Sequence, residues 1–195
     1  MIGYHGTSRD CATKIIESKN FNIDKFVITG DFKIKDCPKM PNDFGSGIYM
    51  FLSNERYNGM ECARKYANIF KDRPSSVLEI NINDDIKCLD FEDKENIDMF
   101  IKLREKIFDR VYYNYKISVK ESGSKKRANL DGIIIEFLIQ HKYKNEVDAV
   151  MGESYTPSYN EERNISNFPN GKEICLRQNE PICWELCKEV HYDLQ

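Results

Sequence analysis

The chain has 195 residues, a length typical of one domain, which argues against two full-sized domains. Its 41% hydrophobic residues include 11 Tyr, 11 Phe and 1 Trp, and this apolar area argues against a disordered chain. The 29 basic and 32 acidic residues give a net charge of −3, so no overall positive field attracts nucleic acids or membranes. No apolar run approaches the roughly 18 residues of a membrane span, and the first ten residues do not resemble a signal peptide. We therefore expect a cytoplasmic protein with no membrane partner.

The cysteines and histidines give little sign of cross-links or metal. Seven cysteines are an odd number, they are dispersed through a chain of ordinary domain size, and no two form a Cys-x-x-Cys pair. We expect reduced thiols in a cytosol. The three histidines are not spaced as metal ligands relative to one another or to the two last cysteines, so we expect no metal. These residues are Cys11, Cys37, Cys62, Cys88, Cys175, Cys183, Cys187, His5, His141 and His191.

The first quarter of the chain predicts a strand, a helix, a long connection and a second strand. The first strand covers residues 2–5, and Ser8 then caps a helix whose apolar residues over 11–16 share one face. The segment 20–44 is polar, contains two prolines and has no sustained period, which is typical of a long functional connection. A strand over 48–52 follows, with alternate side chains on its two faces.

The central part of the chain is predicted to be mainly helical. Apolar residues recur at helical spacing over 62–70, and residues 77–82 then alternate as a strand. An amphipathic helix is expected over 95–111 and a largely buried one over 133–139. Between them, residues 120–127 (Lys-Glu-Ser-Gly-Ser-Lys-Lys-Arg) predict a mobile loop.

The last part of the chain predicts two short strands separated by a polar segment. Residues 147–151 form a strand that ends at Gly152, and residues 174–176 form a strand that begins beside Glu173. The segment 153–172 between them contains two prolines. Short strands interspersed with helices, without a glycine-rich dinucleotide motif or a phosphate-binding loop, indicate the α+β class. We find no internal repeat and treat residues 1–195 as one domain.

Three short motifs each place a polar side chain on or beside a predicted strand. They are His5-Gly6-Thr7, Gly45-Ser46-Gly47-Ile48-Tyr49 and Glu173-Ile174-Cys175-Leu176. In this order they resemble the His-Tyr-Glu class of ADP-ribosyltransferases, which contains the diphtheria-toxin-like enzymes and the poly(ADP-ribose) polymerases. Tyr66, on the helix after the second motif, matches a further aromatic residue of that class. The resemblance implies an ADP-ribosyltransferase-like split β-sheet with surrounding helices, and a small bacterial member of the class.

The chemistry of that class explains these residue types. Cleavage of the bond between nicotinamide and ribose in NAD passes through an oxocarbenium-like state, so a carboxylate beside the ribose, here Glu173, stabilises positive charge. The resemblance implies that His5 binds the adenosine ribose and that Gly6 offers backbone groups to the nicotinamide amide, where a side chain would obstruct the ligand. Tyr49 and Tyr66 would sandwich the nicotinamide ring. The expected catalytic residues are Glu173, His5 and Tyr49. The expected NAD contacts are His5, Gly6, Thr7, Gly47, Tyr49 and Tyr66.

A second carboxylate competes with Glu173. Gln178-Asn179-Glu180 has the Gln-x-Glu form of the Arg-Ser-Glu class of toxins. That class requires an arginine on the first strand and Ser-Thr-Ser on the second, and neither is present here. Asn179-Glu180-Pro181 also reads as a turn after the strand, so we favour Glu173 and keep Glu180 in reserve.

We therefore expect a mono-ADP-ribosyltransferase that uses NAD as co-substrate and modifies an unknown protein or nucleic acid. The alternatives are an NAD glycohydrolase and a binding module for NAD or ADP-ribose that does not transfer. If the protein acts as a toxin, an inhibitory partner is also expected. A cysteine nucleophile is less favoured, because no nucleophile motif surrounds any cysteine. Residues expected to contact the acceptor are Tyr155, Tyr159, Arg163 and Phe168, which an ordinary surface loop explains at least as well. The cluster Lys125-Lys126-Arg127 could contact phosphate, but a solvated charge run explains it better.

Overall fold

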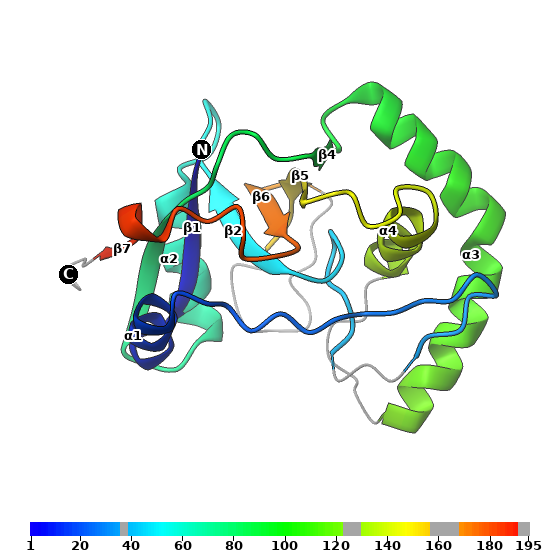
Figure 1. The fold of residues 1–195 in the computed structure, drawn as a ribbon, viewed down its shortest axis with the longest axis horizontal. Coiled ribbons are helices and arrows are strands. Elements are labelled where there is room, and N and C mark those ends of the chain that lie inside the picture. Colours follow the sequence, from blue (N-terminus) through cyan, green and yellow to red (C-terminus); the bar gives the residue numbers. More distant parts are fainter. Residues whose placement is uncertain (36–38, 123–129, 157–167, 191–195) are drawn as a thin grey trace.

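The computed structural model describes residues 1–35, 39–122, 130–156 and 168–190, with side chains for all of them except 117–122 (Figure 1). The four α-helices in this part of the chain are α1 (Arg9–Ser18), α2 (Gly59–Phe70), α3 (Lys94–Ser122) and α4 (Leu130–His141). The strands are β1 (Ile2–Ser8), β2 (Ile48–Leu52), β3 (Ser75–Asn81), β4 (Cys88–Asp90), β5 (Ala149–Ser154), β6 (Gly171–Leu176) and β7 (Lys188–Val190). A 3-10 helix, η1 (Trp184–Leu186), precedes β7.

The strands form one mixed sheet in the order β4-β5-β6-β2-β1-β3-β7. The β4 and β5 strands are parallel, and the other neighbours are antiparallel. The α+β class expected from the sequence is therefore confirmed. The sequence patterns did not predict β4, η1 or β7.

The sheet is weakly joined at its centre. The β1 strand pairs with β3 through seven residues, and β2 pairs with β6 through five. Between β1 and β2, pairing in the described chain is limited to Gly3 with Leu52 and Tyr4 with Phe51. The two central strands consequently separate at the point where β1 continues into His5, and this split divides the sheet into two halves.

Helices cover both faces of the sheet because successive side chains of a strand point to opposite sides. In β3, Val77 packs with Ala63 of α2, whereas the next residue, Leu78, packs with Ala12 of α1. The face that contacts α2 also carries Cys175 of β6, which lies in a cluster formed with α4. In Figure 1, α1 and α2 accompany the β1 half of the sheet and α3 and α4 lie beyond the other half.

The α3 helix is longer than expected. Instead of ending near residue 111 it continues to Ser122, so the prediction of a loop is wrong for residues 120–122, and residues 123–127 lie outside the described chain. No glycine or proline occurs between residue 94 and Gly123, so nothing in the local sequence interrupts the backbone hydrogen bonding of the helix. The expected cap of α1 is confirmed, since the backbone N–H of Cys11 donates to the Ser8 hydroxyl at 3.4 Å.

The six described cysteines are all free thiols, and Cys37 lies outside the described residues. None of the helices in the described part of the chain combines the length and the apolar character needed to cross a bilayer.

Candidate functional site

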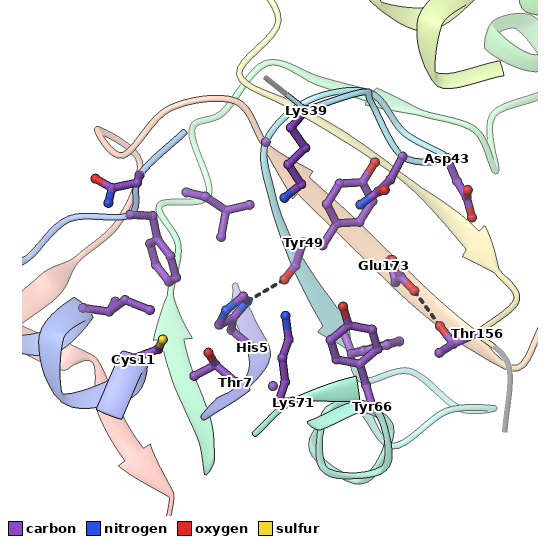
Figure 2. A pocket seen from close by; sticks show the side chains of 18 of the residues that line it. His5, Thr7, Cys11, Lys39, Asp43, Tyr49, Tyr66, Lys71, Thr156 and Glu173 are labelled. Carbon is purple, nitrogen blue, oxygen red and sulfur yellow. Dashed lines mark hydrogen bonds between the residues drawn. The ribbon is translucent and has the colours of Figure 1, made fainter. Parts of the chain in front are cut away.

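A cavity of about 910 Å³ opens at the split between β1 and β2 (Figure 2). Its volume lies within the usual range for a small-molecule site. Its lining includes all seven residues that the sequence predicts as catalytic residues or NAD contacts: His5, Gly6, Thr7, Gly47, Tyr49, Tyr66 and Glu173. These residues come from β1, β2, α2, β6 and the segment before β2. The structure thus brings together side chains up to 168 positions apart in the chain, from His5 to Glu173.

The cavity has walls on both faces of the sheet. Phe21 and Ile15 line it and belong to the core cluster on the α1 face. Tyr66 and Phe51 also line it and belong to the cluster on the α2 face. A ligand that fills the cavity therefore extends through the split, with one end on each face and His5 beside its middle.

His5 is held as a neutral ring with a defined tautomer. Its Nδ1 lies 2.9 Å from the carbonyl oxygen of Tyr49, which only accepts hydrogen bonds, so Nδ1 carries the proton and Nε2 is an acceptor. The pKa of His5 is lowered to about 4, mainly by burial and also by the charges of Lys71 and Lys39, against the effect of this hydrogen bond. The Phe21 ring packs edge to face with the His5 imidazole, with 5.1 Å between the two ring centroids. At neutral pH the Nε2 atom of His5 can therefore accept a hydrogen bond from a hydroxyl group.

The Tyr49 hydroxyl organises the loop that precedes β2. It donates to the Gly45 carbonyl oxygen at 2.8 Å and accepts from the Phe44 N–H at 2.9 Å. Burial raises the pKa of Tyr49 well above its usual value, so the phenol remains a donor. Gly45 has a φ of +94°, a conformation that favours glycine. In Figure 2, the Tyr49 and Tyr66 rings lie on two sides of the space beside Glu173.

The two motif glycines are required by the protein itself. A Cβ at Gly6, the residue where we expect a side chain to obstruct the ligand, would lie 2.3 Å from the Ala63 carbonyl oxygen of α2. At Gly47 a Cβ would lie 2.2 Å from the Leu176 carbonyl oxygen of β6. Both contacts are too short for any residue with a side chain. Close packing of α2 on β1 therefore already requires glycine at position 6.

Glu173 is 9% exposed and lies on β6, on the wall of the cavity. Its Oε1 accepts hydrogen bonds from the Ser154 hydroxyl at 2.8 Å and the Thr156 hydroxyl at 3.2 Å. Two hydroxyl donors on one oxygen fix the orientation of the carboxylate. By contrast, Glu180 is exposed and is not among the residues that line the cavity, so the geometry favours Glu173 over the reserve assignment.

The residues expected to contact an acceptor are only partly described. Tyr155 lines the cavity, and Phe168 is 81% exposed. Tyr159, Arg163 and the cluster Lys125-Lys126-Arg127 lie outside the described residues.

A buried ion pair that was not predicted from the sequence supports the wall formed by Tyr49. Glu136 of α4 is fully buried, and its two carboxylate oxygens accept from the Arg177 guanidinium at 2.6 and 3.0 Å. The same carboxylate accepts from the Ser46 N–H at 2.7 Å and from the Gln140 amide at 3.0 Å. The pair fixes the loop before β2, which the Tyr49 hydroxyl also holds. A charged residue within the apolar run Ile133 to Leu138 was the signal for it in the sequence.

Three lysines also line the cavity and were not predicted: Lys14, Lys39 and Lys71. The carboxylates among its described lining residues are Asp43 and Glu173. The cavity thus carries more positive than negative groups in a chain whose net charge is −3. The described residues contain no group of three or more His, Cys, Asp or Glu side chains arranged to hold a metal ion.

No protein-family model, no curated protein and no solved structure matches the chain.

Proposed function

We propose that this chain is a mono-ADP-ribosyltransferase that cleaves NAD at the nicotinamide–ribose bond and transfers ADP-ribose to a macromolecular acceptor. The observation that carries the proposal is that His5, Tyr49, Tyr66 and Glu173, from four separate elements, line one cavity through the split sheet. NAD is a long molecule with a flat group at each end, so a cavity with a wall on each face of the sheet suits its shape. Residues 1–195 then form a single catalytic domain with an ADP-ribosyltransferase-like fold.

Each of these residues has a role in this proposal. The Nε2 atom of neutral His5 accepts a hydrogen bond from the adenosine ribose, which positions NAD across the split. Tyr49 and Tyr66 hold the nicotinamide ring between two aromatic walls. The Glu173 carboxylate, oriented by Ser154 and Thr156, faces the adjacent ribose and stabilises the positive charge that develops as nicotinamide leaves.

The substitution Glu173→Gln tests this reaction most directly. It preserves shape and removes the charge, so NAD still binds, while turnover is expected to fall by about 10²-fold or more, or roughly 2.7 kcal/mol of transition-state stabilisation. Nicotinamide release by the purified protein and NAD affinity are the two measurements. Glu180→Gln is the matched control and is expected to leave turnover close to that of the wild type. Loss of nicotinamide release in Glu180→Gln, with an active Glu173→Gln, overturns the assignment.

The fate of ADP-ribose separates transfer from the alternatives. In an incubation with cell extract and NAD labelled in its adenosine part, label on a protein or nucleic acid supports transfer. Free labelled ADP-ribose as the product supports a glycohydrolase, and intact NAD with measurable affinity supports a non-transferring binding module. The proposed reaction takes place in a reducing cytosol, consistent with the six free thiols, and an inhibitory partner accompanies the enzyme if it is a toxin.

A further inference from the structure

Two of the cavity lysines come from segments that face each other across the split. Lys71 follows the last residue of α2, and Lys39 belongs to the long connection before β2. Figure 2 shows both amino groups directed at the space in front of the hydrogen bond between His5 and Tyr49, Lys71 from below and Lys39 from above. Both charges also act on His5, since each lowers the pKa of that ring. Positive charge is therefore concentrated beside the middle of the cavity.

The charge of the cavity changes along its length. At the α2 end, Tyr66, Tyr49 and the Glu173 carboxylate form a site suited to a flat ring that carries positive charge. At the α1 end, Phe21 and Ile15 provide an apolar surface. The two lysines lie between these ends, where an ammonium group attracts the anionic part of a ligand. This order matches a ligand with a flat cation at one end, an anionic bridge and an apolar base at the other end.

Lys71 has a defined position for this role. Its Nζ lies 5.3 Å from the centroid of the Tyr66 ring, and it forms no ion pair with another described residue. The ring supports the lysine side chain without neutralising its charge. We infer that Lys39 and Lys71 form a diphosphate-binding clamp, so that the site selects a dinucleotide joined by a diphosphate over nicotinamide mononucleotide or nicotinamide riboside. The inference deepens the proposed function and rests on it for the identity of the nicotinamide end.

The clamp predicts how the protein ranks ligands of decreasing charge. The variants are Lys39→Gln, Lys71→Gln and the double variant, each titrated with NAD and nicotinamide riboside. NAD affinity is expected to fall about tenfold for each lysine removed, because a charge-assisted hydrogen bond to phosphate is lost, whereas nicotinamide riboside affinity stays unchanged. Inorganic pyrophosphate is expected to compete with NAD for binding to the wild type and no longer to do so in the double variant. Lys65→Gln is the matched control, because Lys65 is an exposed lysine of α2 that pairs with Glu61 and does not line the cavity.

Three results decide the inference. Unchanged NAD affinity and unchanged pyrophosphate competition in the double variant overturn the clamp. They leave the proposed reaction intact if Glu173→Gln still lowers nicotinamide release by about 10²-fold or more. An equal loss of NAD affinity in Lys65→Gln also overturns the clamp, because the effect then comes from net charge alone. Lysine-dependent binding of pyrophosphate and NAD by a protein that never releases nicotinamide supports the clamp and rejects the proposed enzyme.

Discussion

The hydroxyl of Tyr49 gives a stability prediction whose size follows from the hydrogen bonds around it. In Tyr49→Phe the Phe44 N–H loses its acceptor, and Phe44 is 7% exposed, so water does not readily replace the bond. The Gly45 carbonyl oxygen loses one donor but keeps the N–H of Asn42 at 3.2 Å. One buried donor left unsatisfied costs about 1–3 kcal/mol. We therefore expect the free energy of unfolding to fall by that amount.

Urea unfolding followed by tryptophan fluorescence or circular dichroism measures this change. Tyr113→Phe is the matched control, because Tyr113 is 67% exposed and its loss of a hydroxyl is expected to change the free energy of unfolding by less than about 0.5 kcal/mol. Tyr49→Phe with the stability of the wild type refutes the reasoning, since the hydroxyl then does not maintain the loop.

The same variant separates the two roles assigned to Tyr49. The phenyl ring keeps its stacking face, so NAD affinity is expected to be largely retained in Tyr49→Phe, whereas Tyr49→Ala is expected to weaken it by roughly 1–3 kcal/mol. Equal NAD affinity in the wild type and in Tyr49→Ala removes Tyr49 from the ligand site. A large loss of affinity in Tyr49→Phe shows instead that loop geometry governs binding.

Three further predictions follow from burial and charge. Arg177→Met is expected to lower the free energy of unfolding by about 3–5 kcal/mol, because it leaves the Glu136 carboxylate buried without its counter-ion. Adding Glu136→Gln to this variant is expected to restore part of the lost stability, as measured by urea unfolding, and no recovery contradicts the ion-pair explanation. The pKa of His5 is lowered from 6.5 to about 4, so between these pH values the unfolded chain binds a proton that the folded chain does not. The free energy of unfolding is therefore expected to fall by up to about 3 kcal/mol as the pH drops through this interval. His5→Gln is expected to flatten this fall, and the same pH dependence in the wild type and the variant contradicts a buried neutral imidazole. Saturating NAD is expected to slow the alkylation of Cys11, which lines the cavity, but not that of the exposed Cys183, as measured by peptide mass spectrometry. Equal alkylation rates at Cys11 with and without NAD place the ligand elsewhere.

Local sequence predicted the elements that carry clear periodicity and the residues that carry recognisable chemistry. The alternation in residues 48–52 and the buried run around Ile133 to Ile139 each correspond to an observed element. The strands Cys88–Asp90 and Lys188–Val190 have three residues each, and three residues are too few for an alternating pattern to be distinguished from a loop. They are strands because β5 and β3 provide hydrogen-bonding partners that are distant in the chain.

The parts of the site that sequence did not predict are those fixed by long-range geometry. Lys71 gains its place beside His5 only when α2 packs on β1, and nothing near Lys71 in the chain indicates this. The packing requirement at Gly6 likewise depends on an Ala63 carbonyl oxygen 57 positions later. Glu136 was visible as a charge within an apolar helix, but its partner Arg177 lies beyond the last predicted strand.

The hydrogen bonds of Glu136 also constrain the order in which the molecule folds. The carboxylate joins Ser46, 90 positions earlier in the chain, to Arg177, 41 positions later. Closing loops of this length is entropically costly, so these contacts are expected to form late and together. The loop before β2 then acquires its final shape only after the segment that contains Arg177 has docked. A nascent chain that has not yet released residue 177 from the ribosome would also lack β6, which joins β2 to β5, and would therefore hold neither a continuous sheet nor a completed cavity.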